Sequence, residues 1–143
     1  MNLTASIVLA LAAFNVGGAQ VTALPAPMPQ VQTVEEYVRD YFADAPIMIE
    51  VAKCESQFRQ FGKDGQVLRN PDSSAVGVFQ IMASIHAELA DQNLGLDVYT
   101  LEGNAAYARH LYEEKGTQPW NASKKCWSKS QVYKNSQSQV AVK

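Results

Sequence analysis

Two cysteines mark the ends of the part of this chain that is patterned for folding. Cys54 lies near the start of that region and Cys126 lies near its end. In an exported protein such a pair favours a disulfide, whereas in a cytosolic protein both residues would be buried thiols. Closing the loop of about seventy residues between them would stabilise the fold by roughly 4 kcal/mol on the chain-entropy model. Which state applies depends on whether the chain is exported.

The first 23 residues contain no charged side chain, and their apolar stretch ends in small residues. This pattern predicts a secretory signal peptide over residues 1–23, with cleavage after Ala19 or Ala23, although no Lys or Arg precedes the apolar stretch. An uncleaved membrane anchor is the alternative, but the apolar run is shorter than the roughly 20 residues that a span needs. We therefore expect a secreted, periplasmic or wall-associated protein with no membrane span after cleavage.

The rest of the chain divides into three parts. Prolines at 25, 27 and 29 indicate an extended, Pro-rich linker over residues 24–32. Residues 33–127 carry the periodic patterns and form one small domain, whose modest core would benefit from a covalent link. Residues 128–143 are polar and unpatterned, and we expect them to be disordered.

The domain reads as mostly helical, with a minor β or loop element (an α+β class). Thr33 and Glu36 form a capping box before an amphipathic helix that runs to about residue 42. Asp44 is expected to cap a second helix from Pro46 to about Gln57. Further helices are expected at 83–92 and at 101–115, followed by a short turn at 118–126. An Asp-Gly turn within 61–70 predicts a small hairpin or irregular lobe.

Charge and histidine content exclude several functions. The net charge of −2 gives no signature of nucleic-acid binding. After Glu114 the chain has six Lys and no acid, so this segment either binds an anionic wall or membrane or simply carries solvated lysines. His86 and His110 are too few for a metal site, and we expect no metal and no cofactor.

Glu55 is the side chain best suited to catalysis. Met48, Ala52 and Glu55 fall at i, i+4 and i+7 of the second helix, so the carboxyl group continues an apolar face. Partial desolvation raises a carboxyl pKa and suits the group to act as a general acid. A surface glutamate is the alternative, but an acid at a helix C-terminus opposes the helix dipole.

Three boxes in order resemble one family. Cys54 to Phe58 (Cys-Glu-Ser-Gln-Phe) resembles the Glu-Ser-x-Phe box of the soluble lytic transglycosylases, which cleave peptidoglycan and have a lysozyme-like fold. Residues 74–82 (Ser-Ala-Val-Gly-Val-Phe-Gln-Ile-Met) are similar to the family's second box. Residues 101–111 resemble its later Asn-containing helix, with Asn104 on the matching Asn. The resemblance covers about residues 45–127. It implies a lysozyme-like fold with a small lobe and a glycan-binding cleft.

The cysteines carry a second resemblance. Val-Ala-Lys-Cys-Glu-Ser at 51–56, together with the segment from Trp120 to Cys126, resembles the resuscitation-promoting-factor domain, which is also lysozyme-like. In that domain a disulfide joins the two equivalent positions. The resemblance therefore implies a Cys54–Cys126 disulfide that holds the last turn against the helix of Glu55.

The resemblance also assigns roles to residues. Glu55 would be the single acid and base, and Gln80 would hydrogen-bond a sugar or its acetamido group. Gly77 would let the backbone approach the glycan because it has no Cβ. Ser56 would support the loop more than perform chemistry, and a serine of the 73–74 turn could hydrogen-bond Glu55. The remaining candidates for substrate binding, each with a core or turn role as the alternative, are Ser74, Phe79, Asn104, Tyr107 and Trp120.

One departure from the family bears on the reaction. The Ala-Tyr-Asn-Ala-Gly box is absent, and residues 119–123 (Pro-Trp-Asn-Ala-Ser) occupy its place. We expect a monomeric lytic transglycosylase that acts on glycan strands of peptidoglycan and binds no nucleic acid. A muramidase, with Asp64 or Asp72 as second carboxylate, and a non-catalytic wall-binding domain of the same fold are the alternatives.

Overall fold

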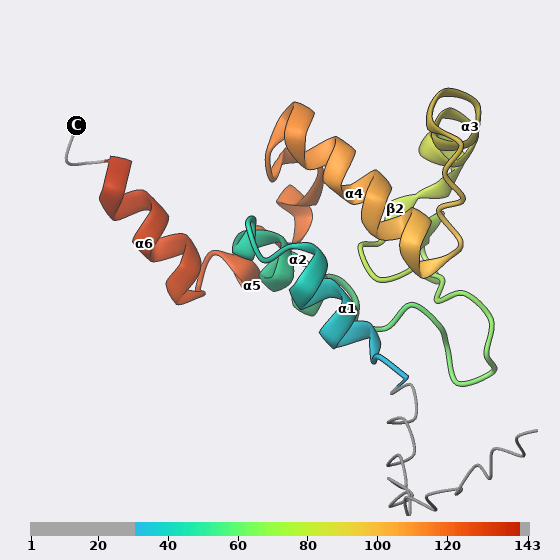
Figure 1. Cartoon of the computed structure of the whole chain (residues 1–143), viewed down its shortest axis with the longest axis horizontal. Coiled ribbons are helices and arrows are strands. Elements are labelled where there is room, and N and C mark those ends of the chain that lie inside the picture. Colours follow the sequence, from blue (N-terminus) through green and yellow to red (C-terminus); the bar gives the residue numbers. More distant parts are fainter. Residues whose placement is uncertain (1–30, 141–143) are drawn as a thin grey trace, which may run out of the picture. The chain divides into compact units, whose positions relative to one another are not determined.

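The computed structural model describes residues 31–140, so the expected signal peptide and most of the expected linker lie outside the described residues. Helices dominate, and one small sheet joins them (Figure 1). This arrangement confirms the mostly α, α+β class. In chain order the elements are α1 (Val34–Tyr41), α2 (Pro46–Ser56), β1 (Ala75–Val76), β2 (Ile81–Met82), α3 (Ala83–Leu94), α4 (Leu101–Lys115), the 3₁₀ helix η1 (Gln118–Ser123), α5 (Lys124–Trp127) and α6 (Gln131–Val140).

The first helix begins as its sequence predicts. The Thr33 hydroxyl accepts a hydrogen bond from the Glu36 backbone N–H at 3.2 Å, and the Glu36 carboxylate accepts the Thr33 backbone N–H at 2.8 Å. Both halves of the capping box are therefore present. These bonds satisfy two of the donors that a helix start leaves unpaired.

The expected cap of α2 is wrong. Ala45 occupies the N-cap position, and no side chain caps this helix. The Asp44 carboxylate instead accepts two hydrogen bonds from the Arg109 guanidinium of α4, at 2.7 and 3.0 Å. This pairing lowers the pKa of Asp44. Asp44 therefore pairs with Arg109, 65 residues further along the chain, and does not cap α2. The helix starts with Pro46 in its first turn.

The small lobe consists of short antiparallel pairings. Ala75 pairs with Met82 and Val76 pairs with Ile81 in the two-stranded sheet. Isolated bridges join Phe61 to Val67 and Arg69 to Val76, so residues 61–70 form the small irregular hairpin that the Asp-Gly turn predicts. In Figure 1 this segment is the green loop that leads into β1.

The core draws on almost every element. Phe42, Phe79 and Trp120 form an aromatic chain, with ring centroids 5.0 Å and 6.3 Å apart along it. Trp127 is also fully buried. Two polar side chains, Gln60 and Asn104, have no exposed surface, and they lie where the lobe meets the helices.

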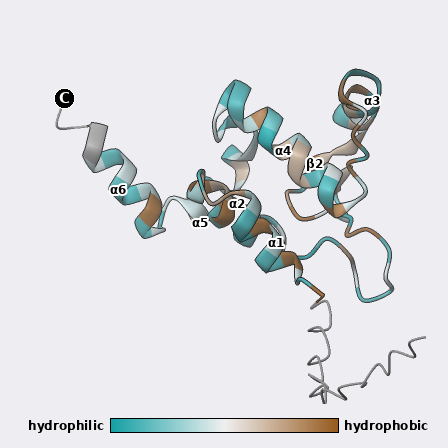
Figure 2. Cartoon of the chain, viewed as in Figure 1, coloured by the Kyte–Doolittle hydropathy of each residue, from teal (hydrophilic) through white to brown (hydrophobic). Residues whose placement is uncertain are grey.

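The segment after the domain differs from the disordered tail expected at 128–143. Residues 131–140 form helix α6. The Tyr133 ring packs edge-on against Trp127 at 5.4 Å, and the Tyr133 backbone N–H bonds the Ser130 hydroxyl at 3.3 Å. The start of α6, nearest α5, carries an apolar residue (brown in Figure 2). The polar composition of residues 128–143 as a whole does not reveal the Tyr133–Trp127 contact, which holds the first turn of α6.

A disulfide joins Cys54 of α2 to Cys126 of α5, with a Cα–Cα distance of 6.0 Å across 72 residues of sequence. The expectation of a disulfide is confirmed. Among the described residues, no helix combines the length and the apolar character that crossing a membrane requires.

Candidate functional site around Glu55

Glu55 lies in the last turn of α2, on the face that the sequence predicts to be apolar. Ala52 and Met48, one and two turns earlier, have no exposed surface, and Glu55 itself is half-buried. Burial raises the pKa of the Glu55 carboxyl group, because desolvation penalises the charged form. A carboxyl group in this environment keeps its proton at a higher pH than an exposed one and is suited to donate it.

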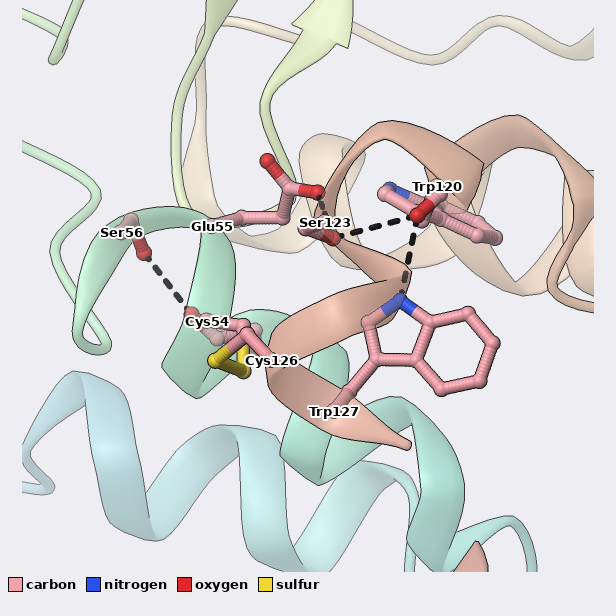
Figure 3. The surroundings of a disulfide bond; sticks show 8 residues. Cys54, Glu55, Ser56, Trp120, Ser123, Cys126 and Trp127 are labelled. Carbon is pink, nitrogen blue, oxygen red and sulfur yellow. Dashed lines mark hydrogen bonds between the residues drawn. A yellow bond between two sulfur atoms is a disulfide. The ribbon is translucent and has the colours of Figure 1, made fainter. Parts of the chain in front are cut away.

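One oxygen of this carboxyl group is held from inside the protein. The Ser123 hydroxyl, at the end of η1, donates to Glu55 Oε1 over 2.6 Å and opposes the burial by lowering the carboxyl pKa. Figure 3 shows the two side chains meeting between α2 and the η1–α5 segment, next to the disulfide. Cys126, one helical turn after Ser123, holds that segment against α2.

The other oxygen reaches the surface. Glu55 Oε2 has no hydrogen bond within the described part of the chain, and no buried polar side-chain atom there lacks a partner. Oε2 is therefore solvent-accessible. The carboxyl group has one fixed oxygen and one that an incoming ligand can reach.

The backbone is strained on the C-terminal side of Glu55. Gln57 and Phe58 have φ angles of 56° and 58°, and Gln80, at the end of the facing turn, has a φ of 50°. Left-handed conformations cost non-glycine residues of order 1 kcal/mol or more and tend to cluster at functional sites. Gln57 and Phe58 end α2 directly after Ser56 and direct the chain into the lobe.

Ser56 has a structural role in this arrangement. Its hydroxyl donates to the Val78 carbonyl at 2.8 Å, lies 3.2 Å from the Ala52 carbonyl and accepts the Arg59 backbone N–H at 3.0 Å. It is 2% exposed. Its hydrogen-bonding groups are used within the protein, and its bond to Val78 ties α2 to the turn between β1 and β2.

Asn104 packs against Gly77 inside the protein, where the lobe meets α4. The Asn104 side chain accepts the Phe79 N–H at 2.9 Å and donates to the carbonyls of Val76 and Val98 at 3.1 and 2.8 Å. Gly77 has a φ of 71°, and the amide of Asn104 fills the space where a Cβ would lie. Both residues are buried and shape the turn from within.

The aromatic candidates also lie in the core. Phe79 has no exposed surface and Trp120 is 3% exposed. The Trp120 indole N–H donates to the Phe79 carbonyl at 2.9 Å, which fastens η1 to the turn before β2. Tyr107 is 4% exposed, and its hydroxyl lies 3.0 Å from His86 Nδ1.

Two candidates remain partly exposed. Gln80 is half-buried, and its side-chain amide donates to the Gly77 carbonyl at 2.9 Å. Ser74 is half-buried and pairs with the Ser84 hydroxyl at 2.7 Å while it accepts the Ser84 backbone N–H. Its recorded partners are at the start of α3, and Glu55 is not among them.

The two acids considered as second carboxylates are exposed turn residues. Asp64 Oδ1 accepts the Gln66 N–H at 3.1 Å, and the Asp72 N–H donates to Asn70. Neither affects the pKa of Glu55. Within residues 31–140 no three His, Cys, Asp or Glu side chains come together as a metal site.

The described surface is hollowed in several places, and Glu55 lines none of five such hollows. One of about 630 Å³ lies along the lobe at residues 62–69, and one of about 670 Å³ lies beside the disulfide. The cleft expected around Glu55 is therefore not one of these five. The carboxyl group opens to solvent at Oε2 outside these five hollows.

Two functional residues were missed by sequence reasoning. Ser123 was noted only as part of the segment that replaces a family box, yet it bonds Glu55. Gln60, fully buried, accepts the Val78 N–H at 2.9 Å and donates to the Tyr99 carbonyl at 3.0 Å. The cysteine pair offers a sequence signal for Ser123. A residue one turn before Cys126 lies on the same side of its helix, and the disulfide places that side next to the turn of α2 that holds Cys54.

Comparisons with known proteins add no relative: no family model, no curated protein and no solved structure matches this chain. The site is therefore interpreted from its own geometry and from the sequence resemblance.

Proposed function

We propose that this protein is an exported, lysozyme-like enzyme that cleaves peptidoglycan as a lytic transglycosylase, at the β-1,4 bond between N-acetylmuramic acid and N-acetylglucosamine. The observation that carries the proposal is the state of Glu55. Its carboxyl group is half-buried with a raised pKa, one oxygen is held by Ser123, and the other is open to solvent. A general acid for glycoside cleavage needs these properties.

In the proposed reaction Glu55 acts twice. Its proton passes to the glycosidic oxygen as the bond from that oxygen to the muramic acid C1 breaks. The C6 hydroxyl of the same muramic acid then attacks C1 and returns its proton to Glu55, which leaves a 1,6-anhydro end. No water is consumed, and the enzyme ends in its starting state.

The surroundings of Glu55 favour this reaction over hydrolysis. A hydrolase usually needs a second carboxylate to place water or to act as nucleophile. The Asp64 carboxylate is engaged in a turn of the lobe, and Asp72 lies in an exposed turn. The pKa of Glu55 has burial and Ser123 as its causes, with no acidic partner. A single acid is what a transglycosylase requires, so a muramidase is the second candidate.

The resemblance implies that Asn104, Phe79 and Trp120 bind substrate, but in this proposal these buried residues support the site from within. Asn104, Phe79 and Trp120 build the scaffold that fixes the turn opposite α2. Glycan contacts would then come from exposed groups around Oε2. The disulfide agrees with export, because oxidising compartments preserve such bonds.

The reaction products test the proposal. Purified protein, a Glu55→Gln variant and a Glu113→Gln control are incubated with peptidoglycan in ¹⁸O-labelled water, and the soluble fragments are analysed by mass spectrometry. Glu113 is an exposed acid of α4 with no hydrogen bond recorded for its side chain, so its loss removes a charge without touching the site. We expect anhydro ends without ¹⁸O from the wild type and the control, and a loss of about 10²-fold or more in the Glu55 variant.

The other outcomes are equally specific. Reducing ends that carry ¹⁸O identify a muramidase. A wild type that releases no fragments yet pellets with the wall identifies a binding domain and removes the enzymatic proposal. Cleavage that persists in the Glu55→Gln variant shows that another residue is the acid.

A further inference from the structure

We propose that Ser123 is the positioning residue that gives the two oxygens of the Glu55 carboxyl group different roles, an inference that rests on the proposed function. Its hydroxyl donates to Oε1 at 2.6 Å, and Oε2 is left without a hydrogen bond among the described residues. Oε1 then serves as the fixed acceptor, and Oε2 carries the proton that the glycosidic oxygen receives.

The Ser123 hydroxyl has one proton and two acceptors within reach. Besides Oε1 it lies 3.1 Å from the Trp120 carbonyl oxygen. That carbonyl already accepts the Trp127 indole N–H at 3.1 Å, so it is satisfied without Ser123. The contact to Oε1 is also the shorter one, and it becomes a charge-assisted hydrogen bond whenever Glu55 is ionised. The proton therefore points to Glu55.

The position of Ser123 is fixed before any ligand arrives. Trp120, three residues earlier, is anchored through its indole N–H to the Phe79 carbonyl. Cys126, three residues later, is bonded to Cys54, the neighbour of Glu55 (Figure 3). Because both ends of this turn are held, the hydrogen bond to Glu55 forms with little loss of side-chain or backbone entropy.

Among the described residues, no charged group hydrogen-bonds the Glu55 carboxyl group or contributes to its shifted pKa. η1 carries no ionisable side chain. The elements packed on α2 also include α1, α5 and α6, and none of their charges contributes to the shifted pKa of Glu55. The charged residues on those three helices are Glu35, Glu36, Arg39, Asp40, Lys124, Lys125 and Lys134.

The chemistry assigns each proton a place. Ser123 keeps its own proton and forms no covalent bond during the cycle. Glu55 Oε2 loses its proton to the glycosidic oxygen and regains one from the attacking C6 hydroxyl. While Glu55 is ionised, the hydrogen bond from Ser123 to Oε1 is at its strongest and stabilises the charge. Without this bond the carboxyl group rotates freely, and the proton is often on the oxygen that faces away from the substrate.

The test compares side chains of matched shape at one position. Ser123→Ala and Ser123→Val lack the hydroxyl, whereas Ser123→Thr keeps it on the β-branched skeleton that Val shares. Ser136→Ala is the control, since the Ser136 hydroxyl donates to the carbonyl three residues earlier, as the Ser123 hydroxyl can, but from an exposed site on α6. Cleavage kinetics on peptidoglycan fragments and a ¹³C NMR titration of the Glu55 carboxyl carbon are measured for each, together with thermal unfolding.

We expect Ser123→Ala and Ser123→Val to lower kcat about tenfold, the effect of losing one charge-assisted hydrogen bond, with KM unchanged. The bond to Ser123 lowers the pKa of Glu55, so its loss raises that pKa further. Activity requires the protonated acid, and its decline at high pH therefore moves to higher pH. Ser123→Thr restores kcat and the pKa, and Ser136→Ala changes neither.

Cleavage activity and the Glu55 pKa distinguish failure of the Ser123 inference from failure of the proposed function. A wild type without cleavage, combined with a Glu55 pKa that rises in Ser123→Ala, removes the proposed function and leaves the pairing of Ser123 with Glu55 intact. An active wild type whose Ala and Val variants keep kcat and the Glu55 pKa overturns the inference. So does a Thr variant that folds and behaves like Val.

Discussion

The side-chain amide of Asn104 lies where a methyl group on Gly77 would have to be. A Cβ built on Gly77 would be 2.5 Å from Asn104 Nδ2 and 2.6 Å from Gln60 Oε1. Gly77 also has a φ of 71°, in the region that favours glycine. The turn that faces α2 therefore requires glycine at position 77, because the side-chain amides of Asn104 and Gln60 fill the space that a Cβ would need.

We expect Gly77→Ala to destabilise the protein by more than about 2 kcal/mol, because backbone strain and a steric clash add. Gly65→Ala is the control, since Gly65 has a φ of 76° but nothing within 4 Å of its built Cβ. Strain alone costs about 1 kcal/mol there. Urea unfolding of both variants measures the difference, and equal losses would show that the packing around Gly77 relaxes freely.

Asn104→Ala should cost roughly 3 kcal/mol, because it leaves three backbone groups unpaired in the core. Asn104→Asp keeps the size of the side chain and the acceptor for the Phe79 N–H but removes both donors. We expect it to be at least as unstable at neutral pH and to recover partly in acid, where the carboxyl group is protonated. A substrate-binding role for Asn104, in contrast, predicts variants that fold normally and have a higher KM.

Glu55→Gln should stabilise the fold at pH values above the raised, folded-state pKa of Glu55. The pKa of Glu55 is raised in the folded state, so its contribution is fully favourable below the unfolded value of 4.5 and is lost as pH rises through the folded pKa. Above its folded pKa the wild type therefore carries a partly desolvated charge that Gln lacks. Thermal unfolding should show a Tm gain for the variant that appears as pH rises through the folded pKa of Glu55 and is absent at about pH 3. The Glu113→Gln control should show no such pH-dependent gain.

Replacing both cysteines with Ser should cost about 4 kcal/mol of unfolding free energy, since the bond closes a span of 72 residues. A reducing agent should destabilise the wild type by a similar amount and leave the double variant unaffected. The mass of the native protein after alkylation, with and without prior reduction, checks the bond itself. Free thiols in the unreduced sample would contradict it.

Local patterns in the sequence predicted the helices and the environment of Glu55. The capping box at Thr33, the stop at Gly116 and the apolar phase of Met48, Ala52 and Glu55 all depend on neighbours within two turns. Such features can be inferred because helix geometry alone fixes which residues share a face. The cysteines were equally informative, since a chain with two has one possible intramolecular pair.

Features that depend on distant partners were missed or misassigned. Asp44 has the form of a helix cap but bonds Arg109. Asn104 matches a family position yet serves the core, because only the fold reveals which carbonyls it meets. Ser123 became visible as the partner of Glu55 only when the disulfide placed η1 beside α2. Helix α6 packs on α2 and places Tyr133 against Trp127, contacts that no periodicity signals.

The disulfide has a consequence for how the protein withstands proteases. An exposed turn of the lobe, at residues 63–66, lies inside the span that Cys54 and Cys126 close. A protease that cuts there produces two fragments, one bearing Glu55 and the other bearing Ser123, which stay covalently joined beside the site. A nicked molecule therefore keeps its acid and the hydroxyl that holds it within reach of each other, and only reduction separates them.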